Sequence, residues 1–87
     1  MNRYIIETSH EREDCLRVLD EFVVHGHITH FEWGCESGVC TGWAIVDAES
    51  EEQARYAVPS FSRAKAKVVK LSQFTPEQIQ GFHEEIG

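Results

Sequence analysis

Apolar residues recur along this chain at two different spacings, and these spacings predict its helices and strands. Between residues 11 and 25 they recur three and four positions apart, which is the repeat of one helical face. The members of this apolar stripe are Cys15, Leu16, Val18, Leu19, Phe22 and Val23. Thr8 and Glu11 have the spacing of a capping box at the helix start, and Gly26 predicts its end. We interpret Cys15 as a small buried hydrophobe of this helix.

Short runs of β-branched and aromatic residues predict four strands, at residues 4–8, 27–33, 41–48 and 67–71. The second and third runs are separated by segment 34–40, whose two glycines suit a hairpin loop. These two strands are therefore predicted to pair antiparallel.

Two further helices are predicted from their start signals. Ser50 and Gln53 form a capping signal before a short apolar stripe that Pro59 should end. Thr75 and Pro76 mark the start of an amphipathic C-terminal helix, because a capping residue before proline at the first helical position is a typical helix start. The apolar residues of this last helix are Ile79, Phe82 and Ile86.

The predicted order of elements is βαββαβ followed by a helix. This order is typical of the α+β class and of the ferredoxin-like, split-βαβ arrangement, in which a four-stranded antiparallel sheet carries two helices on one face. A chain of 87 residues has room for one domain, so we predict a single ferredoxin-like α+β domain over residues 1–87. Because two helices cover only one sheet face, the other face is open to water, to a ligand or to a second subunit.

Several segments resemble small uncharacterised bacterial proteins of the dimeric α+β barrel superfamily. The segments are residues 4–10, 31–35, 41–46, and 58–59 ahead of 67–69. The superfamily includes muconolactone isomerases, antibiotic-biosynthesis monooxygenases, chlorite-dismutase-like haem proteins and small metal-binding proteins. The resemblance implies a homodimer in which two open sheet faces pair into a barrel around a cavity. It carries no catalytic motif that transfers residue by residue.

Charge and hydropathy narrow the classes of partner. The chain has 8 Lys and Arg residues against 15 Asp and Glu residues, a net charge of −7, which repels phosphate backbones and anionic lipids. We therefore expect no nucleic-acid or membrane partner. The sequence has neither an apolar run of about 18 residues nor a signal-peptide pattern at its start, so the expected compartment is the cytoplasm. Its lysines near residue 67 are typical of a protected edge strand.

Histidines and cysteines near the centre of the chain suggest a transition-metal site. His25, His27 and His30 are followed by Cys35 and Cys40, and imidazole and thiolate are preferred ligands of zinc and nickel. On a strand, His30 would share a face with Glu32 whereas His27 would lie on the other face. The alternative is that His25 and His27 only satisfy carbonyl groups at a helix end.

The pair Cys35 and Cys40 lies at the two ends of the predicted hairpin loop, close enough to clamp one metal ion. We predict a metal site formed by Cys35, Cys40 and His30. A tetrahedral site needs further ligands, and Glu36, His10 or a second subunit are candidates. Two alternatives remain open, because the pair is also compatible with unreactive free thiols or with a redox-active couple.

Strand parity suggests a second, catalytic constellation. Glu7 shares a strand face with Ile5, His30 shares one with Glu32, and Lys70 shares one with Val68. If these polar groups face a barrel cavity, they are positioned for general acid and base chemistry, with His30 as base and Glu7 or Glu32 as acid. The alternative is that they point to water.

We therefore expect a dimeric α+β barrel protein that binds a small ligand or a transition metal, zinc or nickel. The expected location is the open sheet face or the loop between the second and third strands. One alternative is a cofactor-free isomerase or oxygenase acting on a small organic molecule. Another is an assembly module without catalysis.

Overall fold

The computed structural model describes residues 1–86, and within them the chain alternates strands with short helices. The strands are β1 (Asn2–Ser9), β2 (Glu32–Trp33), β3 (Thr41–Ala48) and β4 (Lys67–Lys70). The α-helices are α1 (Cys15–Val24), α2 (Glu51–Arg55), α3 (Ser60–Arg63) and α4 (Pro76–Ile86). Single turns of 3-10 helix lie at η1 (Arg12–Asp14), η2 (Ile28–His30) and η3 (Cys35–Ser37).

The strands form one four-stranded antiparallel sheet in the order β2-β3-β1-β4. The long central pair is β1 with β3, in register from Asn2 opposite Ala48 to Ser9 opposite Thr41. Strand β4 pairs with the other side of β1 and β2 pairs with the far side of β3, so β4 and β2 are the edges. The predicted α+β class with a four-stranded antiparallel sheet is therefore confirmed.

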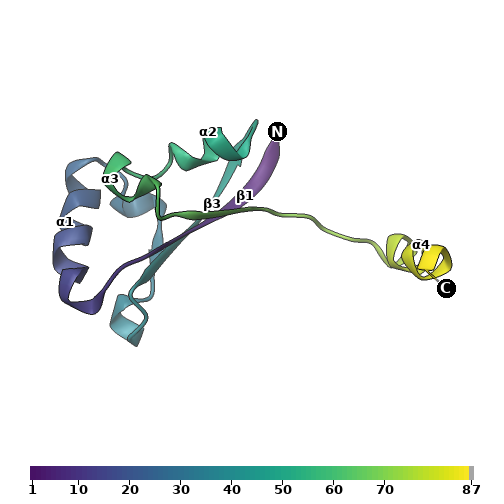
Figure 1. Cartoon of the computed structure of the whole chain (residues 1–87), viewed down its shortest axis with the longest axis horizontal. Coiled ribbons are helices and arrows are strands. Elements are labelled where there is room, and N and C mark those ends of the chain that lie inside the picture. Colours follow the sequence, from purple (N-terminus) through teal and green to yellow (C-terminus); the bar gives the residue numbers. More distant parts are fainter. Residues whose placement is uncertain (87) are drawn as a thin grey trace.

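Alternation along β1 and β3 gives the sheet one buried face and one open face. On β1, Tyr4, Ile6 and Thr8 are buried, whereas the residues between them are more exposed. Helices α1, α2 and α3 gather on the buried face (Figure 1), and Phe22 of α1 and Val58 after α2 pack there with Ile6. The burial of apolar side chains on this face is the main stabilising contribution to the fold.

Phe22 is the centre of the core. Its ring is fully buried and makes edge-on contacts with Phe31, Trp33 and Phe61, at centroid distances of 5.3, 4.9 and 5.9 Å. These partners come from the segment around β2 and from α3. One aromatic side chain thus joins α1 to two segments that are distant from it in sequence.

The second sheet face is not covered by any helix within residues 1–86. Its apolar side chains are Ile5 on β1, Trp43 and Ile45 on β3, and Val69 on β4, and Ile45 and Val69 remain 53% and 42% exposed. Exposed apolar side chains gathered on one sheet face are typical of a docking surface.

The strand predicted over residues 27–33 is wrong for most of its length, because only Glu32 and Trp33 form β2. After α1, Gly26 adopts a positive φ of 75° and the amide of His27 donates to the carbonyl of Phe22 at 2.9 Å, which reverses the chain. Residues 28–30 then turn as η2, so that Ile28 packs against the core. Pairing with β3 begins only after this turn.

Two helix starts were predicted correctly and one was not. Gln53 donates its amide to the Ser50 hydroxyl at 3.1 Å, and Thr75 and Gln78 exchange a reciprocal pair of capping bonds. Thr8, by contrast, lies buried in β1 and caps nothing, and α1 begins at Cys15 after the η1 turn. Strand β1 extends to Ser9, one residue beyond the strand predicted over residues 4–8.

Beyond β4 the chain runs outward as an extended segment, and α4 stands apart from the sheet and the other helices (Figure 1). Among residues 1–86, no helix has both the length and the apolar character needed to cross a lipid bilayer.

The substitution Phe22→Ala should lower the free energy of unfolding by about 3–5 kcal/mol, because it removes a fully buried ring with three aromatic partners. Urea denaturation measures this loss. The matched control is Leu16→Ala on the same helix, where the side chain is 77% exposed and the expected change is within about 0.5 kcal/mol. Equal losses in the two variants would contradict the packing described.

Candidate metal centre

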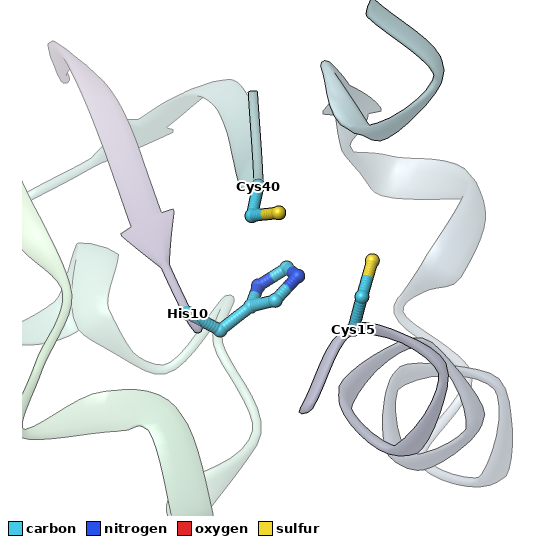
Figure 2. Close-up of side chains that lie close together, drawn as sticks. All are labelled: His10, Cys15 and Cys40. Atoms are coloured by element: carbon cyan, nitrogen blue, oxygen red, sulfur yellow. The ribbon is translucent and has the colours of Figure 1, made fainter. Parts of the chain in front are cut away.

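Three side chains that are distant in sequence meet at one end of the sheet. One ligand atom each from His10, Cys15 and Cys40 lies within 4.8 Å of the other two. Figure 2 shows the imidazole of His10 between the two cysteines, with both sulfur atoms directed toward the space beside the ring. We call these three residues the thiol–imidazole cluster.

The central strand pair places two members of the cluster side by side. His10 directly follows β1 and Cys40 directly precedes β3, and these strands pair up to Ser9 opposite Thr41. The pairing continues one step further, because the amide of His10 donates to the carbonyl of Cys40 at 3.0 Å. The hydroxyls of Ser9 and Thr41 also share a hydrogen bond of 3.2 Å. The backbone therefore fixes His10 next to Cys40.

The third member comes from the start of α1. Between β1 and α1 the chain turns through η1, where the amide of Asp14 donates to the carbonyl of Glu11 at 3.0 Å. This turn reverses the chain, so that Cys15, the first residue of α1, lies close to His10. A short, tightly folded connection therefore brings a helix start back onto a strand end.

Cys35 lies next to the cluster on the loop between β2 and β3. This loop is closed by bonds from the amide of Gly34 to the carbonyl of Thr41 and from the amide of Val39 to the carbonyl of Gly34, both 2.9 Å. Gly38 has a φ of 85° at the end of η3, a left-handed conformation that favours glycine. The closed loop holds Cys35 near Cys15.

The thiols of Cys15, Cys35 and Cys40 influence one another. A hydrogen bond with Cys35 raises the pKa of the Cys15 thiol, burial and the charge of Cys35 raise it further, and a hydrogen bond with Cys40 acts in the opposite direction. Cys15 therefore lies close to both of the other cysteines. All three cysteines are free of disulfide bonds and partly buried.

The imidazole of His10 has no polar partner among the described residues. Both ring nitrogens are buried, and neither makes a hydrogen bond. Burying a polar group without a partner costs about 1–3 kcal/mol, so such groups are rare in folded proteins and indicate a missing ion or water. A metal ion at the centre of the cluster would satisfy one of these nitrogens.

The geometry fits a tetrahedral metal ion. Zinc binds thiolate at about 2.3 Å and imidazole nitrogen at about 2.0 Å, so tetrahedral ligand atoms lie roughly 3.5–3.8 Å apart. The three ligand atoms lie within 4.8 Å of one another, so side-chain rotations would bring them to these separations around a bound ion. With Cys35, which lies beside this group, the cluster would supply a donor set of the Cys₃His type found in structural zinc sites.

A cavity of about 430 Å³ adjoins the cluster, and His10 lines part of its wall. Thr8 and Ser9 of β1 also line this cavity, together with Phe61 and Lys65. The cavity therefore reaches the His10 side of the cluster.

Of the metal site predicted from sequence, Cys40 belongs to the cluster and Cys35 lies beside it, but His30 is not a member of the group. His30 lies exposed on η2, and its ring contacts His27 at a centroid distance of 5.8 Å. His27 donates from Nδ1 to the carbonyl of Ala57 at 2.6 Å, which is a structural role. The density of histidines between residues 25 and 30 therefore did not indicate the imidazole that lies in the cluster.

Cys15 was missed as a site residue, because its place in the apolar stripe of α1 indicated a buried hydrophobe. In the structure it is only partly buried and lies at the first position of the helix. A signal for the cluster was present in the register. His10 just after one strand and Cys40 just before its antiparallel neighbour must lie side by side if the strands pair along their whole length.

The predicted catalytic residues are only partly brought together. Both glutamates lie on the open sheet face as strand neighbours of Trp43, Glu7 on β1 and Glu32 on β2. The indole Nε1 of Trp43 donates a hydrogen bond to Glu7 at 3.0 Å. His30 does not share a strand face with Glu32, because η2 interrupts the strand. The strand parity argument placed Val68 and Lys70 on the face of the predicted catalytic group. This choice of face is wrong, because Val68 packs against the core on the other face.

The β4 residues of the open face are Lys67 and Val69 rather than Val68 and Lys70. Together with Ile5, Glu7 and Trp43 they line a cavity of about 220 Å³. Lys67 stands directly opposite Glu7 in the strand register. This second cavity lies on the opposite side of the sheet from the helices.

Comparison of the chain with protein-family models, with curated proteins and with solved structures gives no significant match. Function therefore has to be argued from the geometry and chemistry of the site itself.

The substitution Gly38→Ala should lower the free energy of unfolding by about 1–2 kcal/mol, because an L side chain is strained at this positive φ. The control is Gly81→Ala in α4, where φ is not positive and an added Cβ meets nothing within 4 Å. That change should leave stability unaltered or raise it by up to about 1 kcal/mol. Chemical denaturation of the two variants compares them, and an unaltered Gly38→Ala protein would contradict the geometry of the loop.

Proposed function

We propose that this protein binds one zinc ion through His10, Cys15 and Cys40, with Cys35 as the fourth ligand. The observation that carries the proposal is the buried imidazole of His10, whose nitrogens lack partners while two thiols point into the same space. Thiolate and imidazole are the ligands that zinc prefers, and three thiolates with one imidazole form a closed tetrahedral shell.

The position of the cluster supports a structural role for the zinc ion. Its ligands come from the end of β1, the start of α1, and both ends of the β2–β3 loop. A metal that ties these segments together stabilises the folded state and not the unfolded chain, so its binding free energy adds to folding. Small domains with thin cores often depend on such an ion.

The ligand set is tested by substitution. His10→Ala, Cys15→Ala and Cys40→Ala should each weaken zinc binding by at least about 100-fold, since even the loss of a residue that supports a ligand costs 10–100-fold. Zinc per chain is measured by elemental mass spectrometry, and the dissociation constant by competition with a chromophoric chelator. The wild-type chain should retain one zinc ion, and saturating zinc at 100 times the dissociation constant should raise its stability by about 2.7 kcal/mol.

The matched control is His83→Ala, since His83 lies exposed on the remote helix α4. Its zinc affinity should equal that of the wild-type protein. Cys35→Ala tests the fourth position and should lower affinity while leaving a three-ligand site. Wild-type affinity in the His10→Ala and Cys15→Ala proteins would contradict the proposal.

We also infer that the chain has the split-βαβ, ferredoxin-like arrangement and forms a homodimer through its open sheet face. The support is the strand order, in which β3 is inserted beside β1 while β2 and β4 lie at the edges. Exposed Ile45 and Val69 on the uncovered face supply the apolar surface for association. Light scattering on size-separated protein should give about twice the chain mass of 10.0 kDa, and a monomer would contradict the inference.

The catalytic alternative has weaker support than zinc binding. An isomerase or oxygenase with His30 as base needs this imidazole beside Glu7 or Glu32, and His30 lies instead on η2. Glu7 is already engaged by the indole of Trp43.

A further inference from the structure

Helix α4 is the part of the chain with the least support from its own protomer. It has 11 residues, and isolated helices shorter than about 12–15 residues are only marginally stable in water. The radius of gyration of the chain is 16.4 Å, against about 12 Å for a compact domain of this length, because α4 stands away from the body (Figure 1). This helix therefore needs a surface to pack against.

The arm formed by residues 71–86 has an apolar face suited to such packing. Phe74, Ile79 and Phe82 are 59%, 42% and 43% exposed, and the rings of Phe74 and Phe82 already contact each other edge-on at 5.6 Å. The spacing of three residues between Ile79 and Phe82 puts both on one side of the helix. Two large apolar side chains on one side of a short helix, with Phe74 packed beside them from the preceding segment, are typical of an element that docks in a groove.

The open sheet face has the complementary surface. Its centre is the cavity of about 220 Å³ lined by Ile5, Trp43 and Val69, with Ile45 exposed beside it. This face and the arm are thus two of the uncovered apolar surfaces among the described residues. Covering one with the other would remove both from water.

Charge favours the same pairing along the β4 side of the face. The segment 71–87 contains Glu77, Glu84 and Glu85 and neither Lys nor Arg. On this face, β4 presents Lys67 and the neighbouring β1 presents Arg3, whereas Lys70 lies on the other face of β4. The acidic residues of the face are Glu7, Glu32 and Asp47. Glu7 accepts a hydrogen bond from the Trp43 indole, and Asp47 stands opposite Arg3 in the strand register. An acidic helix therefore fits best over β4 and the adjacent half of β1.

The direction of the arm favours a second copy as the recipient. The amide of Leu71 bonds to the carbonyl of Arg3 at 2.8 Å, and residues 71–75 then run outward from the end of β4. Five extended residues carry the helix up to about 17 Å from this point. In a pair related by a two-fold axis, each arm reaches the other chain, so the contact between arm and sheet face is made twice.

We propose that two copies of this chain exchange arms, so that α4 of each packs on the open sheet face of the other. This inference rests on the proposed homodimer and is independent of the zinc site. It names the occupant of the open face, which is a helix of the second copy rather than the second copy's sheet.

The experiment is light scattering of the full-length chain and four single variants during size separation. Phe82→Asp and Ile79→Asp place a charge on the arm, Ile45→Asp places one on the receiving face, and Leu16→Asp on exposed α1 is the matched control. The wild-type and Leu16→Asp proteins should be dimers. The two arm variants and the face variant should be monomers, with dissociation constants raised by at least about 100-fold.

Mixing two monomeric variants gives the sharpest readout. Phe82→Asp retains an intact face and Ile45→Asp retains an intact arm, so an equimolar mixture should recover a heterodimer through one sound contact. Circular dichroism and urea unfolding check that each variant keeps its sheet and core.

The possible outcomes separate the two inferences. A dimeric Phe82→Asp and Ile79→Asp protein together with a monomeric Ile45→Asp protein would overturn arm exchange and leave direct pairing of the two sheets. A monomeric wild-type chain would overturn both arm exchange and the homodimer.

Discussion

The pairing of β1 with β3 determines the position of almost every other feature. Its register runs from Asn2 opposite Ala48 to Ser9 opposite Thr41, and the next backbone bond joins His10 to Cys40. The same register decides which side chains meet the helices and which remain on the open face, since a slip by one residue would exchange the two sets. The core, the thiol–imidazole cluster and the open apolar face all depend on this one antiparallel ladder.

The cluster places a polar group where the fold itself offers it no partner. A buried imidazole without a hydrogen bond is costly, whereas the same ring held against two thiols is a ligand ready for a soft metal. Phe22 organises one end of the helical layer, and zinc would organise the adjoining strand ends and loop. In a chain this small, a bound metal ion would compensate for the limited area that the core buries.

The sequence predicted the sheet and the long amphipathic helix, because both have regular apolar spacing over many residues. It failed where a tertiary contact decided the local conformation. The segment around His30 has a strand-like composition, but packing of Ile28 and Phe31 against Phe22 turns it into η2. Cys15 has the spacing of a core residue, and only the η1 turn, which no local pattern indicated, brings it to His10. Of the candidate site, Cys35 and Cys40 were therefore predicted as ligands. His10 was named only as one of several possible further ligands.

X-ray absorption at the zinc edge of the zinc-loaded full-length protein tests the central claim most directly. The account predicts a four-coordinate shell of mixed sulfur and nitrogen ligands, with zinc–sulfur distances of about 2.3 Å and a zinc–nitrogen distance of about 2.0 Å. The sulfur contribution should fall in the Cys15→Ala and Cys40→Ala proteins, and the nitrogen contribution should fall in the His10→Ala protein. A shell of oxygen and nitrogen without sulfur would contradict the assignment of zinc to this cluster.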